Sequence, residues 1–117
     1  MTNDVVKNSN QISIIIPTYN ESQNILNVLQ SIKDNLPKNL SAQAIVVDDN
    51  SPDGTGKIVE DYLKSLKKIT NYTIEIIHRK TKDGLGSAIL KGIQQATGDT
   101  IVVMDSDFSH PPQVIPK

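Results

Sequence analysis

The sequence contains no cysteine and no tryptophan, and only 3% of its residues are aromatic. The lack of cysteine excludes disulfide bonds and thiolate metal sites. No apolar run approaches the roughly 18 residues expected of a membrane-spanning helix. The formal net charge is -1 and like charges form no block, so a nucleic-acid-binding surface is not expected. Residues 1–11 are polar, lack the apolar core of a signal peptide, and are predicted to form a flexible tail.

The chain instead contains short apolar runs that alternate with segments of helical periodicity. The runs predicted to be strands are residues 12–16, 44–47, 73–77 and 100–104. Apolar residues recur at helical spacing in residues 25–36, 58–69 and 85–96. Nearly continuous apolar strands are typical of parallel sheets, because helices cover both faces. The pattern therefore predicts one α/β domain over residues 1–117, with a Rossmann-like, mostly parallel sheet and flanking helices.

The ends of these elements carry signals of their own. Pro17 is expected to stop the first strand, and Asn20 and Thr55 are candidate N-caps for the first two helices. Gly98 is expected to end the third helix. After a pair of prolines, residues 114–115 are expected to begin another helix.

Polar and charged residues follow every predicted strand. These segments are, in chain order, PTYNE, DDNSPDGT, HRKTKDG and DSDFSHPP. In a parallel sheet the carboxyl ends of the strands share one edge, and ligands bind outside that edge where the strand order reverses. The sequence therefore predicts a ligand site at this edge.

The last of these segments contains Asp105 and Asp107. Carboxylates two residues apart at the end of a strand tend to point to the same side, and bringing them together is costly without a cation or donors between them. One or two carboxylates plus substrate phosphates are the usual ligands of Mg²⁺ in such sites. The pair is therefore a candidate metal site for a phosphorylated substrate.

Other motifs have a simple explanation beside the functional one. The ring of Tyr19 can lie against a nucleobase, although a surface tyrosine needs no ligand. We expect either Asp48 or Asp49 to accept a hydrogen bond from a ribose hydroxyl or a base N–H, and the residues after them to form a turn. Residues 49–60 also match the spacing of a calcium-binding loop, but a strand rather than a helix precedes them, so we reject that interpretation.

Basic residues and glycines follow the third strand. Arg79, Lys80 and Lys82 are expected to be mainly solvated, although one of them can face a diphosphate. Gly84 and Gly86 open a helix whose free N–H groups can attract an anion. Close packing of that helix on the sheet is the expected reason for the two glycines.

Taken together, PTYNE, VVDDNSPDGT, GLGSA and DSDFSHPP resemble the family 2 glycosyltransferases of the GT-A fold. The second and fourth motifs are most similar to those of the polyprenyl-phosphate mannosyltransferases, the dolichol-phosphate mannose synthases. The resemblance extends from about Ile12 to the last residue, with the motifs in the family's order. It implies that the chain is the N-terminal, nucleotide-binding portion of a GT-A fold.

The resemblance also implies roles for individual residues. The residues matching nucleotide contacts are Pro17, Tyr19 and Glu21, Val47 and Asp49 around the base, and Asp105 and Ser106. The residues matching the metal site are Asp105 and Asp107, which are also the implied catalytic residues, together with Ser109. Many relatives have Ala in place of Ser106 and Gln in place of Ser109, so the metal shell here would rely more on water.

The implied reaction is transfer of a sugar, with inversion, from a nucleotide donor to a polyprenyl (dolichyl) phosphate. The implied donor is GDP-mannose, the implied cofactor Mg²⁺ or Mn²⁺, and the implied location the cytosolic face of a membrane, reached through the lipid substrate or through further segments. Two alternatives stay open: a related polyprenyl-phosphate glucosyltransferase, and a nucleotide-binding module or subunit without catalysis. Family members continue well beyond HPP, so we expect a truncated domain that lacks the acceptor half and has little activity alone.

Overall fold

The structure is a computed structural model that describes residues 11–66, 71–80, 84–104 and, by their backbone, 113–116. Its strands are β1 (Gln11–Thr18), β2 (Ser41–Asp48), β3 (Tyr72–His78), β4 (Thr100–Val103) and β5 (Gln113–Pro116). Its helices are α1 (Ile25–Asn35), α2 (Thr55–Ser65) and α3 (Leu85–Gln95). The sheet order is β3-β2-β1-β4-β5, parallel throughout except for the antiparallel pair β4–β5. The predicted α/β class with a mostly parallel sheet is confirmed.

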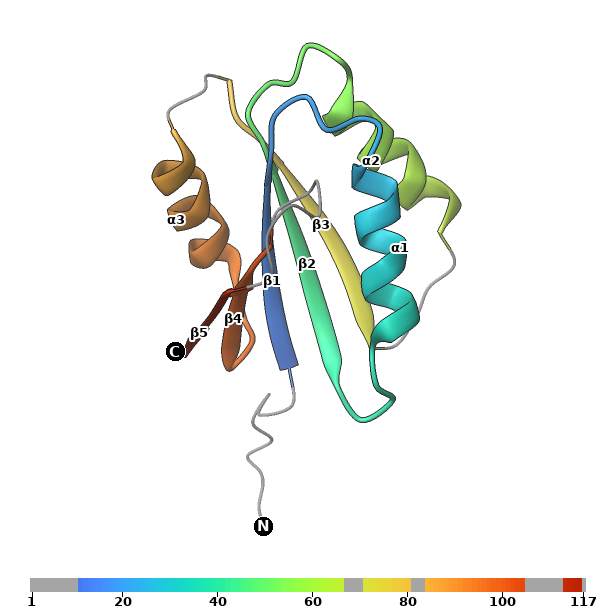
Figure 1. Cartoon of the computed structure of the whole chain (residues 1–117), viewed down its shortest axis with the longest axis vertical. Helices are drawn as coiled ribbons and strands as arrows, with labels where there is room; N and C mark the ends of the chain where they lie inside the picture. The colour runs from blue at the N-terminus through green and yellow to red at the C-terminus, as the bar shows by residue number, and fades with distance from the viewer. Residues whose placement is uncertain (1–10, 67–70, 81–83, 105–112, 117) are drawn as a thin grey trace.

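Three layers result, with α1 and α2 on one face of the sheet and α3 on the other (Figure 1). Because strand side chains alternate between faces, Ile14 and Ile16 pack toward α1 and α2, whereas Ile15 packs toward α3. In β2, Val46 packs toward α1 and α2 and Val47 toward α3, and both are fully buried. Both faces of the central strands are therefore core, which explains their continuous apolar runs.

Pro17 does not stop β1, which continues to Thr18 with Pro17 opposite Val47 of β2. The carbonyl of Ile15 accepts from the N–H of Met104 at 3.0 Å, so alternate residues of β1 direct their backbone groups toward β4. The nitrogen of Pro17 points to that same side, but the pairing with β4 ends at Ile15 and Val103. No ladder hydrogen bond is lost, which is why proline is tolerated here.

The predicted helix at residues 114–115 is wrong, because these residues belong to β5. Val114 lies opposite Val102, and Ile115 opposite Ile101, in the antiparallel pair. The free backbone groups on the outer side of β4 offer this short β-branched segment hydrogen bonds that one isolated helical turn would not provide.

The predicted N-caps at Asn20 and Thr55 are also wrong. Asn24 precedes α1, whereas Asn20 lies in the loop with a φ of 58°, a left-handed conformation that asparagine tolerates. Gly54 precedes α2 with a φ of 85°, and Thr55 is the first residue of the helix. Within the part of the chain that the structure describes, no helix is long and apolar enough to cross a membrane.

A buried polar cluster fixes the end of α3 to the sheet. Gln43, only 4% exposed, donates to Glu75 Oε2 at 2.7 Å and to the carbonyl of Gln95 at 3.1 Å, and its Oε1 accepts from Ser13 Oγ at 2.8 Å and from the N–H of Thr97 at 2.9 Å. These bonds position α3, and thus the site at its other end.

Gly98 follows α3 but is not its left-handed cap, because Ala96 occupies the C-cap position with a φ of -72°. The N–H of Gly98 donates to Ser13 Oγ at 2.8 Å. A Cβ at this position would lie 2.7 Å from the carbonyl oxygen of Gln11, so glycine is required here by the close approach to β1.

Candidate functional site

A pocket of about 120 Å³ lies at the carboxyl edge of the sheet, beside the start of α3. Its lining residues are Pro17, Thr18, Tyr19, Asp49, Leu85 and Ala88. The strand order reverses at β1, which has β2 on one side and β4 on the other, so the pocket lies where such sheets bind ligands. A cavity of ~150 Å³ holds benzene, so this pocket suits part of a nucleobase rather than a whole sugar nucleotide.

The rim of the pocket exposes apolar surface. Tyr19 is 40% exposed and Leu85 is 63% exposed; Tyr19 directly follows β1, and Leu85 is the first residue of α3. Aromatic and aliphatic side chains in this arrangement can contact the faces of a planar ring. Pro17, which lines the pocket beside Tyr19, belongs to the same strand end.

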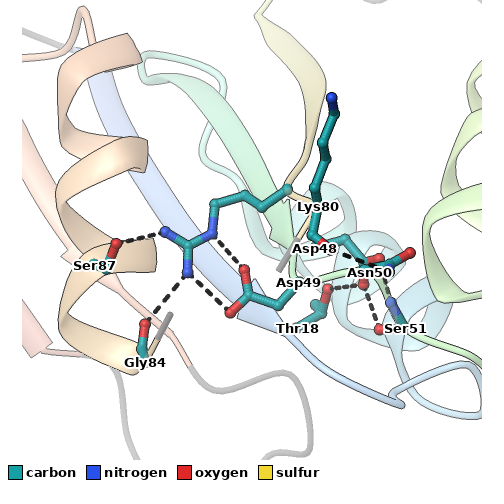
Figure 2. Close-up of polar contacts among 9 residues, drawn as sticks. Thr18, Asp48, Asp49, Asn50, Ser51, Lys80, Gly84 and Ser87 are labelled. Atoms are coloured by element: carbon teal, nitrogen blue, oxygen red, sulfur yellow. Dashed lines mark hydrogen bonds and ion pairs between the residues drawn. The ribbon is translucent and has the colours of Figure 1, made fainter. Parts of the chain in front are cut away.

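Asp49, on the pocket wall, forms a bidentate ion pair with Arg79 (Figure 2). The Nε–Oδ1 distance is 2.5 Å and the Nη2–Oδ2 distance is 3.1 Å, and the two side chains are 10% or less exposed. Arg79 Nη1 also donates to Ser87 Oγ at 2.7 Å, and Nη2 to the carbonyl of Gly84 at 3.5 Å. Arg79 therefore joins the exit of β2 to the start of α3 across the pocket wall.

The prediction that Arg79 is mainly solvated is therefore wrong. β2 and β3 are neighbours in parallel register, with Asp48 opposite His78, so the residues that follow them also lie side by side. The backbone N–H of Arg79 donates to the carbonyl of Asp48 at 2.8 Å and continues this pairing. The register of two strands was the missing information, and a sequence alone does not contain it.

The two neighbouring aspartates have different surroundings. Asp48 is 3% exposed and accepts from Thr18 Oγ1 at 2.7 Å, from the N–H of Ser51 at 3.0 Å and from Ser51 Oγ at 2.6 Å (Figure 2). Its carboxylate is occupied within the loop. Asp49 is the member of the pair that reaches the pocket, and each of its oxygens retains a lone pair beyond those that Arg79 occupies.

Two other predicted nucleotide contacts lie near the pocket but outside its lining. Glu21 is half-buried, and its carbonyl accepts from the N–H groups of Asn24 at 3.0 Å and Ile25 at 2.9 Å, which starts α1. Val47 is fully buried in the cluster with Ala88, so its side chain lies beneath the pocket.

Three hydrogen bonds connect the loop after β1 to the loop after β2. The pairs are Asn20 N–H with Ser51 Oγ at 2.9 Å, Glu21 N–H with Thr55 Oγ1 at 3.0 Å, and Ser22 N–H with Asp53 Oδ2 at 3.0 Å. We call this set the loop clamp. The residues after Asp49 are predicted only to form a turn, and the alternation of polar side chains at 51, 53 and 55 is the feature of the sequence that indicates the clamp.

Asp53 is the acidic member of the clamp. Desolvation by the surrounding chain raises the pKa of its carboxyl group, but hydrogen bonds from Thr55 and Ser22 outweigh this effect and lower the pKa to about 2. The group therefore remains ionised, and a pure acceptor, at neutral pH.

The glycines at the start of α3 do not have the predicted packing role. A Cβ at Gly84 or Gly86 would have no neighbour within 4 Å. Gly84 has a φ of 98°, which explains glycine at that position. Gly92 is the closely packed glycine of this helix, because a Cβ there would lie 2.5 Å from Ile15 Cγ2.

The predicted metal and catalytic residues Asp105, Asp107 and Ser109, and the predicted nucleotide contact Ser106, lie outside the described residues. β4 runs parallel to β1, so its carboxyl end lies at the edge of the sheet that holds the pocket. Within the described ranges, no group of three or more His, Cys, Asp or Glu side chains could hold a metal ion. The metal-site prediction therefore rests on the sequence pattern and on the direction of β4.

Comparisons with known proteins agree with this arrangement. The family model for glycosyl transferase family 2 matches residues 13–117. Dolichol-phosphate mannosyltransferase from Pyrococcus furiosus is 42% identical over 92% of this chain and 28% of its own length. Undecaprenyl-phosphate mannosyltransferase from Micrococcus luteus is 36% identical over 92% of this chain and 42% of its own length. This chain thus spans less than half the length of either relative.

Solved structures give the same result. Mannosyltransferase PcManGT from Pyrobaculum calidifontis, in complex with GDP-Man and Mn²⁺, has a TM-score of 0.71 and 27% identity, over 82% of this chain and 27% of that chain. The neighbouring structures are GT-A glycosyltransferases. Since the family model covers nearly the whole chain and the fold agrees with it, the chain belongs to glycosyl transferase family 2.

Proposed function

We propose that this chain forms the nucleotide-binding part of a metal-dependent, inverting glycosyltransferase that transfers mannose from GDP-mannose to a polyprenyl phosphate such as dolichyl phosphate. The observation that carries the proposal is the pocket at the sheet edge, where Pro17, Tyr19 and Asp49 come together. These residues match the family's nucleotide contacts. The mannosyltransferase names of the relatives and the GDP-Man complex of the structural neighbour support the choice of donor.

The pocket chemistry suits a guanine base. The ring of Tyr19 would cover one face of the base, while the Asp49 carboxylate would accept from base N–H groups through its remaining lone pairs. Arg79 would hold Asp49 in place, since a bidentate pair restricts the orientation of the carboxylate. A uracil base offers a single ring N–H, so fewer donors would face Asp49.

Asp105 and Asp107, with Ser109, would hold Mg²⁺ or Mn²⁺ together with the donor diphosphate. A bound divalent ion supplies Lewis-acid stabilisation of the leaving nucleoside diphosphate. The acceptor is a phosphate monoester whose second pKa is about 6, so it is already ionised at neutral pH and needs no general base. The described residues would contribute the base pocket, and the carboxyl end of β4, which precedes the two aspartates in the sequence, lies at the same edge of the sheet. Because the acceptor is a lipid, the reaction would take place at the cytosolic surface of a membrane.

Calorimetric titration with GDP, UDP and ADP, each with and without Mn²⁺, tests the nucleotide assignment. We expect GDP to bind most tightly and Mn²⁺ to strengthen binding. Tyr19→Ala should weaken GDP binding about tenfold through loss of stacking, and Asp107→Ala should abolish the effect of Mn²⁺. Asp61→Ala is the matched control, because Asp61 is an exposed aspartate on α2 that pairs with Lys57.

Two results would contradict the proposal. The first is no binding of any nucleoside diphosphate with Mn²⁺ present, and the second is binding that Tyr19→Ala and Asp107→Ala leave unchanged. A transfer assay with GDP-mannose and a polyprenyl phosphate, using the chain within the longer protein of its relatives' length, tests the reaction itself.

A further inference from the structure

The loop that carries Tyr19 is held by an unusually complete set of hydrogen bonds. Three successive backbone N–H groups directly after Tyr19 each donate to a side chain of the loop after β2, forming the loop clamp. All three acceptors come from residues 51–55. In Figure 1 the two loops lie together above the sheet, on the side of α1 and α2.

Carboxylates determine which groups of the loop clamp donate and which accept. Thr55 Oγ1 donates its single proton to Asp53 Oδ1 at 2.5 Å, and Ser51 Oγ donates to Asp48 Oδ1 at 2.6 Å. An ionised carboxylate only accepts, so each hydroxyl directs its proton toward the carboxylate and offers its lone pairs to a backbone N–H. Asp53 therefore governs two of the three clamp bonds: it orients Thr55, and its other oxygen accepts from Ser22.

The held loop has a conformation that needs support. Asn20 has a φ of 58°, and both Tyr19 and Asn20 are exposed, so burial contributes little to fixing them. A non-glycine residue in the left-handed region is less favourable than in the extended or helical regions. The loop clamp begins at the N–H of this residue and continues over the next two, so it can stabilise this conformation.

We propose that Asp53 is a positioning residue for the pocket: its carboxylate, acting through Ser22 and Thr55, holds the Tyr19 loop in the conformation that contacts the nucleotide. This inference rests on the proposed function for the identity of the ligand. Asp53 does not line the pocket and acts through the backbone of residues 21–22.

Asp53 also contacts the start of α2, because its Oδ1 accepts from the backbone N–H of Thr55 at 3.1 Å. A purely structural role would therefore be to start this helix. The substitution Asp53→Asn separates the two roles. Asparagine can keep an oxygen toward the two donors of Thr55, but it then presents an N–H₂ group to the N–H of Ser22.

The experiment compares amide hydrogen exchange, measured by NMR without ligand, with GDP binding in the presence of Mn²⁺. In Asp53→Asn we expect the Ser22 amide to exchange about tenfold faster, because a charge-assisted hydrogen bond is lost. The Glu21 amide should change little, and GDP should bind several-fold more weakly. In Asp53→Ala both amides should lose protection. Asp61→Asn, which makes the same charge change elsewhere on α2, should alter neither measurement.

The midpoint of thermal unfolding further separates the positioning role of Asp53 from a purely structural role. We expect Asp53→Asn to retain the midpoint of the unsubstituted chain within a few degrees, because the hydrogen bonds from Thr55 to the side chain of residue 53 persist. Unchanged exchange at Ser22 would overturn the proposal, as would lost protection at Ser22 without any loss of GDP affinity. If the unsubstituted chain bound no GDP, the proposed function would fail, and the exchange pattern alone would decide whether Asp53 fixes the loop.

Discussion

The ion pair between Asp49 and Arg79 combines structural and binding roles at a single pair of residues. Asp49 is 6% exposed, and a carboxylate so deeply buried is costly without a partner. The planar guanidinium satisfies both oxygens and still reaches the start of α3 through Ser87. An ammonium group provides no such fork.

Substitution of Arg79 should therefore affect stability and binding together. We expect Arg79→Ala to lower the free energy of unfolding by about 3 kcal/mol, the cost of leaving a buried charge unpaired. Arg79→Lys should recover only part of this loss and should still weaken GDP binding. Urea unfolding and GDP titration measure the two effects. Lys80→Ala is the control, since its side chain is exposed, and an equal effect of both substitutions would contradict the assigned role.

Among the described helices, α3 is the one that lines the pocket, through Leu85 and Ala88, and the carbonyl of Gly84 just before it accepts from Arg79. Its distance from the sheet is set at Gly92, where a Cβ would lie 2.5 Å from Ile15 Cγ2. Ile15 is fully buried in the central strand and cannot move aside freely. Close packing at Gly92 therefore controls the position of the earlier turns of α3, which carry Leu85 and Ala88.

The substitutions Gly92→Ala and Gly86→Ala form a matched pair within α3. Gly92→Ala should destabilise the fold by about 1–3 kcal/mol through overpacking, and should weaken nucleotide binding by displacing α3. Gly86→Ala should stabilise it by about 0.5–1 kcal/mol, because the site is open and alanine favours the helix. Unfolding midpoints in urea compare the two. A stabilising effect of Gly92→Ala would show that the contact with Ile15 does not limit the packing of α3.

At the scale of the whole molecule, Gln43 connects the central sheet to the layer formed by α3. Its side chain links β1, β2 and β3 with the segment after α3 through Ser13, Glu75, Gln95 and Thr97. Every donor and acceptor of its amide has a partner, which is the condition under which a buried polar group is tolerated.

Replacement of Gln43 by methionine keeps the volume but removes these partners. We expect Gln43→Met to lower the free energy of unfolding by about 1–3 kcal/mol, since buried donors such as the Thr97 N–H lose their acceptor. Gln94→Met, at an exposed position of α3, should change it by less than about 0.5 kcal/mol. Chemical denaturation of both variants provides the comparison. Equal stability of the two variants would mean that water replaces the lost contacts.

The element types were largely predictable because each depends on local periodicity. The runs around Ile14 and Val46 are continuous and β-branched, and three helices follow the 3.6-residue pattern. The incorrect predictions concern where elements end and which segments contact each other. Pro17 remains in β1 because no neighbour needs its N–H, and residues 114–115 form a strand because β4 offers them an edge. Both outcomes depend on segments distant in the sequence.

The candidate site likewise has features that follow from residue order and features that depend on tertiary contacts. Residue order alone determined that polar loops follow each strand, and hence that Tyr19 and Asp49 share one edge of a parallel sheet. The resemblance of the motifs already pointed to Asp49 rather than Asp48 as the nucleotide contact. Only the tertiary structure decided that Arg79 is the partner of Asp49 and that Asp53 reaches the loop after β1. The physical reason is that periodicity is a property of neighbouring residues, whereas strand register and loop contacts are set by packing between segments about thirty residues apart.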